Sequence, residues 1–359
     1  MHMTDLKRKS NLELLRILAM FFIILIHLAS AMDLSHFGLE GKFGHVLGGG
    51  IVGICNIGVT CFCLISGYFG IKFSLEKLLK MEIMMIVYSL LETLILWKVF
   101  PDQMQGAALL EQLVKSFFPF VSRKYWFYSC YVCLFLFSGY IQKFIDMLKE
   151  EELKKFIALS LLIFSVFPTI FYFDIMQDAG KGLVQMITVY IIGRYICIYK
   201  DVPVKRKVAI PLFLILWVLN TISIIFPIRF GSIVHSLCRD NSITNITMAI
   251  LLFYIFKNIN FSSKNINKLT SYMFAAFALE NALVNVTAKI ITHRELYINS
   301  AILGIILLPG TVFSILALCL GIGAILDLLF SKIERKAIAS AVQVINVLYE
   351  KIRNRFKLE

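Results

Sequence analysis

Residues 10–32 read SNLELLRILAMFFIILIHLASAM, an apolar run long enough to cross a lipid bilayer as one helix. Three ionisable side chains interrupt this run: Glu13, Arg16 and His27. Ionisable groups inside a membrane helix are costly, so they mark candidate functional positions. Arg16 and His27 are eleven residues apart, which in a helix is about three turns and roughly 16 Å. One helix face therefore presents a guanidinium near one membrane surface and an imidazole deep in the bilayer.

The start of this run carries two local signals and leaves two plainer interpretations open. Glu13 lies three residues before Arg16, which predicts an ion pair, and Ser10 followed by Glu13 has the pattern of a capping box. In one plainer interpretation Arg16 extends to the membrane surface and His27 is an ordinary core histidine. In the other, the run is a secretory signal peptide; the charged pair at its front disfavours this interpretation.

The composition of the chain indicates a membrane protein. Of its 359 residues 59% are hydrophobic and only 16% are charged, whereas soluble domains are about one quarter charged. The net charge of +13 fits basic cytoplasmic loops better than a nucleic-acid partner. The eight cysteines show neither metal-ligand spacing nor a disulfide framework. We therefore predict an all-α, multi-pass protein of the cell membrane with no metal, no bound cofactor and no nucleic-acid partner; the oligomeric state stays open.

Ten apolar segments predict about ten transmembrane helices. These segments are 12–32, 50–71, 81–99, 125–142, 156–173, 182–199, 208–227, 242–257, 269–290 and 299–330. Lys and Arg crowd the connections on one side, which places both termini in the cytoplasm. Between the segments we expect a loop over 33–49, a short helix before Pro119 and a charged linker over 143–155. Pro309 and Gly310 predict a kink or a break in the last span.

The end of the chain forms a separate region in this interpretation. Apolar residues recur at helical spacing from Ile338 to Phe356, and basic residues crowd the last turns. This pattern is typical of an amphipathic helix lying on an anionic membrane surface, and a solvated helix packed on the membrane domain is the alternative. We predict a transmembrane domain over residues 1–332 and a cytoplasmic amphipathic tail over 333–359.

Several of these features together resemble the membrane-bound acyltransferase-3 family. The spacing of Arg16 and His27 is similar to a motif at the start of those proteins. Residues 61–68, CFCLISGY, resemble the family's second-span pattern, and Trp126-Phe127 is similar to the usual start of its fourth span. The resemblance covers residues 10 to about 335. It implies an O-acyltransferase of cell-envelope polysaccharides and related glycans, with acetyl-CoA or another acyl-CoA as co-substrate.

The residues and the resemblance together suggest three catalytic side chains. His27 is the candidate general base, or alternatively a transient acyl carrier, and burial is expected to help keep it neutral. Arg16 is expected to hold the donor, and Glu280 to orient His27 or the acceptor. Many family members have a His before a Glu-Asn pair, whereas this chain has Leu279 before Glu280 and Asn281. The chain is then expected to use Glu280 alone or to take a different acceptor.

The remaining candidates concern substrate binding. Donor phosphates favour cations on the inner side, and hydroxyl groups can bond the thioester oxygen as it becomes an oxyanion. The predicted donor-binding residues are Arg16, Lys72, Lys77, Lys80, Ser66, Tyr68 and Arg194. The predicted acceptor-binding residues are Asn281, Trp126 and His36. For Ser66, close helix packing is the alternative. The expected partners are acyl-CoA, an envelope saccharide or its lipid-linked precursor, and membrane lipids.

A transporter or flippase for a lipid-linked saccharide is the competing function. In that case Arg16 and His27 line a transport pathway. Transporters commonly show paired halves with matching broken helices, whereas only the last span here contains a clear Pro-Gly break. The sequence therefore favours the enzyme.

Overall fold

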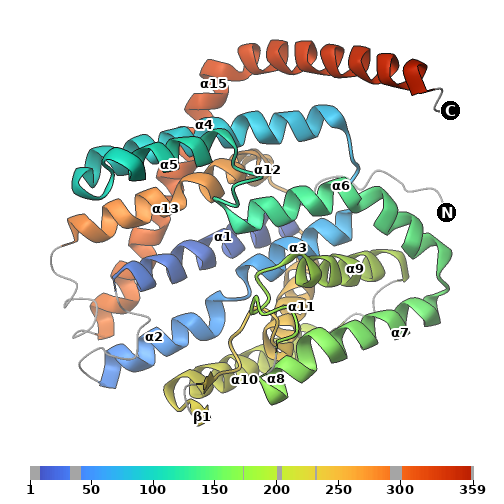
Figure 1. Cartoon of the computed structure of the whole chain (residues 1–359). Coiled ribbons are helices and arrows are strands. Elements are labelled where there is room, and N and C mark those ends of the chain that lie inside the picture. The colour runs from blue at the N-terminus through green and yellow to red at the C-terminus, as the bar shows by residue number, and fades with distance from the viewer. Residues whose placement is uncertain are drawn as a thin grey trace.

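The computed structural model describes residues 9–32, 42–172, 174–199, 204–230, 233–291 and 301–356 and is almost entirely helical (Figure 1). The helices of the first half are α1 (Ser10–Ala31), α2 (Lys42–Cys55), α3 (Gly58–Phe69), α4 (Leu75–Val99), α5 (Gly106–Phe117) and α6 (Trp126–Met147). Those of the second half are α7 (Glu150–Leu161), α8 (Phe167–Phe171), α9 (Leu183–Tyr199), α10 (Arg206–Ile225), α11 (Ile243–Lys257), α12 (Lys264–Leu269), α13 (Met273–Ile290) and α15 (Ala301–Phe356). Shorter elements are the 3₁₀ turns Pro101–Gln103 and Thr270–Tyr272, the π-helical turn Leu162–Val166 and the antiparallel strands β1 (Ile228–Phe230) and β2 (Ile233–His235).

Each of the ten predicted spans overlaps helical structure. Within the described ranges, six helical stretches are long and apolar enough to cross a membrane: Ser10–Ala31, His45–Phe69, Glu150–Phe171, Arg206–Ile225, Lys264–Ile290 and Ile306–Leu348. Two more apolar helices are shorter, Leu183–Tyr199 and Ile243–Lys257. The chain is therefore an integral membrane protein. The short helix predicted before Pro119 is confirmed as α5.

The second span differs most from its prediction. Residues 42–49 are not a loop, because α2 begins at Lys42 and contains the three glycines Gly48–Gly50. α2 packs closely on α10 in this stretch, where a Cβ on Gly49 would lie 3.0 Å from Ile225 Cγ1, so glycine permits the close approach. α2 ends at Cys55 and α3 begins at Gly58, so the span is interrupted between them.

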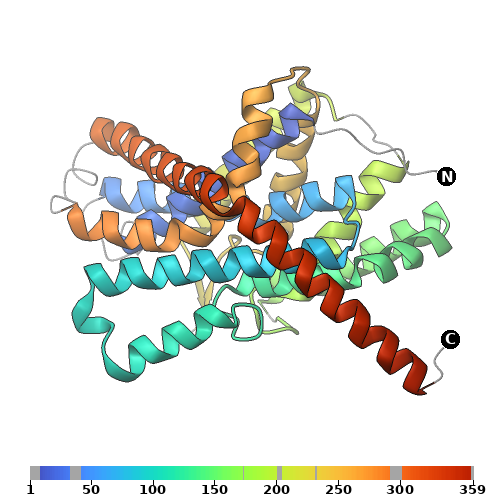
Figure 2. The same cartoon turned by 90° about the horizontal axis from the view of Figure 1, so that it is seen from above.

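The last span is the opposite case: of the kink or break predicted at Pro309 and Gly310, the break is absent. α15 is one helix of 56 residues that contains Pro309 and continues across residues 332–333. Its orange and red parts point in different directions (Figures 1 and 2). The predicted linker over 143–155 is also wrong, because only Leu148 and Lys149 separate α6 from α7.

The capping box predicted at Ser10 and Glu13 is wrong as well. Lys9 is the N-cap residue of α1 and has no side-chain capping bond. The Ser10 hydroxyl instead accepts a hydrogen bond of 2.9 Å from the Ser263 N–H group, and Glu13 pairs with Arg16. Both side chains that a capping box requires therefore bond to other groups instead.

α1 lies at the centre of the packing and contacts α2, α3, α11, α13 and α15 (Figure 1). The segment containing α12 and α13 runs parallel to α1. Ser263 bonds to Ser10 and Glu280 bonds to His27, so both segments advance by the same number of residues, 253 apart, in the same direction. α3 runs antiparallel, because Tyr68 meets Lys9 whereas Gly58 packs against Ala19. These directions decide which residues lie at each end of the cavity beside α1.

Candidate active site

A cavity of about 720 Å³ lies along one face of α1. α1 contributes Arg16, Ile23, Ile26, His27 and Ser30 to its wall, which is roughly 21 Å of helix at 1.5 Å per residue. The volume lies within the range of small-molecule and cofactor sites. The prediction that Arg16 and His27 share one side of the helix is therefore confirmed, and both side chains line one cavity.

The contact between His27 and Glu280 defines one end of this cavity. His27 Nδ1 lies 2.8 Å from Glu280 Oε1, which joins α1 to α13. An ionised carboxylate only accepts hydrogen bonds, so Nδ1 donates and Nε2 keeps its lone pair. The second carboxylate oxygen of Glu280 has no hydrogen-bond partner among the described residues. A histidine oriented by a carboxylate in this way is the arrangement of a general base.

His27 and Glu280 differ in exposure. Half of the His27 side chain is exposed, whereas only 7% of the Glu280 side chain is. The imidazole therefore meets the cavity, and the buried Glu280 holds its Nδ1 side.

Replacing Glu280 with glutamine should test this contact. An amide oxygen still accepts from Nδ1, but it gives no negative charge to the imidazolium that forms during proton transfer. A charge-assisted hydrogen bond is stronger than a neutral one by about 1–1.5 kcal/mol, so kcat should fall about tenfold with little change in KM. Steady-state rates across pH measure this effect, and an unchanged pH profile in Glu280→Gln would contradict the orienting role.

Arg16 marks the opposite end of the cavity. Its Nη1 lies 3.3 Å from Glu13 Oε1, as predicted, and Glu13 is almost completely buried. The guanidinium also lies 5.7 Å from the centre of the Phe69 ring. Ser66 lines the same cavity and, because α3 runs antiparallel to α1, it lies at the Arg16 end. A cation held by a buried carboxylate is thus presented to the cavity.

The other predicted donor-binding residues lie outside the cavity wall. Lys80 Nζ is 3.4 Å from Glu334 Oε1 on α15, Lys77 is exposed and Lys72 is on the connection before α4. Tyr68 is buried beside Phe253, with its hydroxyl 3.3 Å from Lys9 Nζ. Arg194 is buried and donates from Nε to Gln142 Oε1 at 2.8 Å, which ties α9 to α6.

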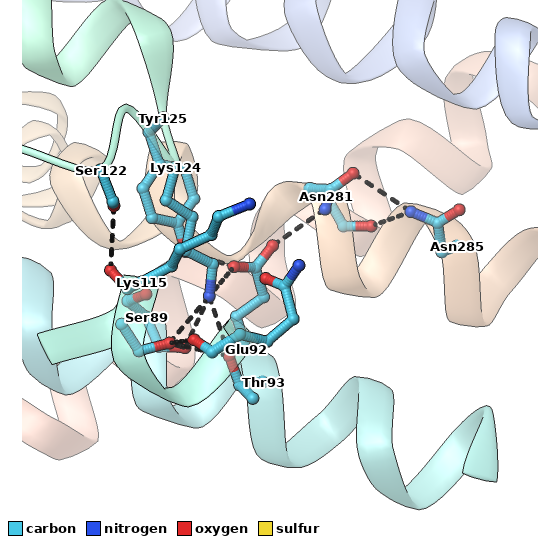
Figure 3. Close-up of polar contacts among 11 residues, drawn as sticks. Ser89, Glu92, Thr93, Lys115, Ser122, Lys124, Tyr125, Asn281 and Asn285 are labelled. Carbon is cyan, nitrogen blue, oxygen red and sulfur yellow. Dashed lines mark hydrogen bonds and ion pairs between the residues drawn. The ribbon is translucent and has the colours of Figure 1, made fainter. Parts of the chain in front are cut away.

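The predicted acceptor-binding residues have three different outcomes. Trp126, at the start of α6, lines the cavity. Asn281 does not; its Nδ2 donates to Glu92 Oε1 at 2.9 Å (Figure 3). His36 lies outside the described residues.

Glu92 belongs to a buried polar cluster that sequence reasoning missed (Figure 3). Lys124 Nζ lies 3.1 Å from Glu92 Oε2 and donates to Thr93 Oγ1 at 2.8 Å and to Ser116 Oγ at 3.0 Å. The Tyr125 hydroxyl also donates to Glu92. This cluster ties α4, α5 and the connection just before α6 to α13, where Asn281 follows Glu280. Glu92 is an ionisable residue inside a predicted span, so the rule that identified His27 also applies to it.

Lys181 and Asp240 are two further charged residues of the cavity wall that the sequence did not indicate. Both lie on connections between helices, far from α1 in the sequence. Only the packing of those connections brings them to the cavity. Among the described residues no group of three His, Cys, Asp or Glu side chains could hold a metal ion.

Comparison with known proteins identifies the family of this chain. Residues 9–324 match the acyltransferase domain of the acyltransferase 3 family. A search of curated proteins and a search of solved structures gave no match. The match covers α1 with Arg16 and His27, and α13 with Glu280. Because the matched region is most of the chain, the protein belongs to the acyltransferase 3 family.

Proposed function

We propose that this protein is a membrane O-acyltransferase. It moves an acetyl or other acyl group from acyl-CoA to a hydroxyl of an envelope glycan or its lipid-linked precursor. The observation that carries the proposal is the His27–Glu280 contact of 2.8 Å inside a cavity that extends to Arg16. Family membership supports acyl transfer, and the resemblance described above suggests the donor and the acceptor.

The two ends of the cavity suit the two ends of the donor. A guanidinium binds phosphate oxygens well, and Glu13 fixes its position. With its phosphates near Arg16, the pantetheine arm follows α1 and brings the thioester toward His27. In this arrangement Ser66, which lines the cavity at the Arg16 end, contacts the arm.

The reaction at His27 is a direct transfer. The acceptor hydroxyl gives its proton to His27 Nε2 and its oxygen attacks the thioester carbon. The new C–O bond forms, the C–S bond breaks, and the proton passes from His27 to the departing CoA thiolate. Glu280 stabilises the imidazolium between these two proton transfers.

Replacing Arg16 with lysine should weaken donor binding. Lysine keeps the charge but loses the planar fork that contacts two phosphate oxygens. The KM for acetyl-CoA should rise about tenfold, the effect of losing one hydrogen bond between charged groups. The KM for S-acetylpantetheine, which has no phosphate, should not change. Arg123→Lys, at an exposed position outside the cavity wall, is the control; equal effects on both donors would contradict the assignment.

The function itself is tested with purified protein in lipid nanodiscs. Wild type should release CoA from acetyl-CoA and transfer labelled acetyl to a saccharide. A transporter or flippase would leave the thioester intact. Mass comparison of envelope glycans from cells with and without the protein should show loss of acyl groups; unchanged glycans together with no CoA release would overturn the proposal.

A further inference from the structure

Two connections line the cavity toward the end away from Arg16. Residue 240 lies between β2 and α11, and residue 181 lies between α8 and α9. The first connection is held by Asn56, whose Nδ2 donates to the Cys238 carbonyl, and by Gln185, whose Nε2 donates to the Asp240 carbonyl at 3.2 Å. Because α3 runs antiparallel to α1, Asn56 lies toward the His27 end. The connections therefore have defined positions beside the base.

The second connection packs directly on the first. Gly180 has φ +85°, and a Cβ there would lie 2.3 Å from the Asn241 backbone nitrogen, so only glycine fits. The Gly180 N–H donates to Asp178 Oδ1 at 2.8 Å, which fixes the turn before Lys181. The packing of these two connections on each other thus brings Lys181 and Asp240 to the cavity wall.

Trp126 completes this group. It lines the cavity together with Lys181 and Asp240, and it shares a small adjoining cleft with Asp240. A carboxylate accepts hydrogen bonds from hydroxyl groups, an ammonium donates to them, and an indole ring packs on an apolar face. A sugar ring offers all three complementary features, whereas a simple alcohol offers one hydroxyl.

The charges at this end disfavour an anionic ligand. Asp240 and Glu280 contribute two carboxylates, against the single ammonium of Lys181. Burial raises the pKa of Asp240 to about 6, the Lys181 ammonium acts in the opposite direction, and Asp178 and His27 also act on this carboxyl group. Asp240 is therefore ionised at neutral pH and protonated below about pH 6.

We infer that Asp240 and Lys181 form the acceptor subsite and select a neutral saccharide over an anionic one, presenting its hydroxyl to His27. This inference rests on the proposed function and adds the residues that decide which acceptor is taken. Asp240 and Lys181 bind the hydroxyls next to the reacting one, and Trp126 packs on the ring.

Three matched acceptors test the inference in nanodiscs supplied with labelled acetyl-CoA. Octyl β-glucoside is neutral, octyl β-glucuronide has the same ring with a carboxylate in place of the 6-hydroxymethyl group, and 1-octanol has one hydroxyl and no ring. Wild type should acylate the glucoside with a kcat/KM at least about tenfold above that for either other acceptor. Octanol has no hydroxyls next to the reacting one, so it loses the charge-assisted contacts to Asp240 and Lys181, and the carboxylate of the glucuronide is repelled by Asp240 and Glu280. Its acceptor KM should rise as the pH falls below about 6.

Substitutions then separate the subsite from the donor site. Asp240→Asn removes one carboxylate from the subsite, so the KM for the glucoside should rise about tenfold. For the same reason the discrimination against the glucuronide should fall, and the acceptor KM should no longer depend on pH. Lys181→Met should increase discrimination against the glucuronide. Neither should change the KM for acetyl-CoA. Asp102→Asn, at an exposed position outside the cavity wall, is the matched control.

The failures of the two proposals are distinguishable. If wild type shows no turnover of acetyl-CoA, the proposed function fails and this inference fails with it. If turnover is present but wild type prefers octanol, acylates none of the three acceptors or keeps its discrimination in Asp240→Asn, only the inference is overturned. A raised acetyl-CoA KM in Asp240→Asn also overturns it, because Asp240 would then belong to the donor site.

Discussion

Replacing His27 with alanine is expected to lower acetyl transfer by about 10²- to 10⁴-fold, the usual contribution of a general base. The loss should be in kcat rather than in the KM for acetyl-CoA, because Arg16 and the donor end of the cavity are unchanged. Half of the His27 side chain is already exposed, so its removal leaves no cavity in a packed core. Initial rates of CoA release and of acetylated product measure the effect.

Two controls make the His27 result specific. His45→Ala removes another histidine of a membrane helix, whose Nε2 lies 3.4 Å from the Ile225 carbonyl outside the cavity wall, and it should keep full activity. Added imidazole should restore part of the rate in His27→Ala, because it can occupy the vacated position beside Glu280. Full activity of His27→Ala would remove the base from the mechanism.

Breaking the buried Lys124–Glu92 pair is expected to produce the largest loss of stability. Only 9% of the Lys124 side chain and 2% of the Glu92 side chain are exposed. Burial lowers the pKa of Lys124, and Glu92 acts in the opposite direction. Lys124→Met leaves Glu92 as a buried charge without its counter-ion, which costs about 3–5 kcal/mol. Thermal unfolding in detergent, followed by a thiol-reactive dye on the buried cysteines, should show a much lower midpoint.

A double-mutant cycle separates this pair from general packing. Glu92→Gln together with Lys124→Met should recover much of the stability, because no unpaired charge remains. The exposed pair Lys115–Glu111 on α5 is the matched control: Lys115→Met should leave the unfolding midpoint nearly unchanged. Equal losses at the two pairs would contradict the role assigned to burial.

The sequence was sufficient for the features that depend on local pattern. Apolar length predicted the helices, and helical spacing predicted the pair of Glu13 with Arg16 and the shared side of Arg16 and His27. It failed where tertiary contacts compete with local signals. The Gly48–Gly50 run forms helix in a segment where α2 packs on α10, and α15 continues through Pro309 without a break.

The sequence by itself determined a membrane protein and the three ionisable positions of its first span, because hydropathy and helical periodicity are properties of short segments. The resemblance already suggested that Glu280 acts with His27, and the two side chains meet because α13 runs parallel to α1. Only the tertiary structure added Lys181 and Asp240, which reach the cavity because two connections pack together. Contacts of this kind join residues far apart in the sequence. They depend on the directions in which helices pack, and the sequence of a single segment does not determine those directions.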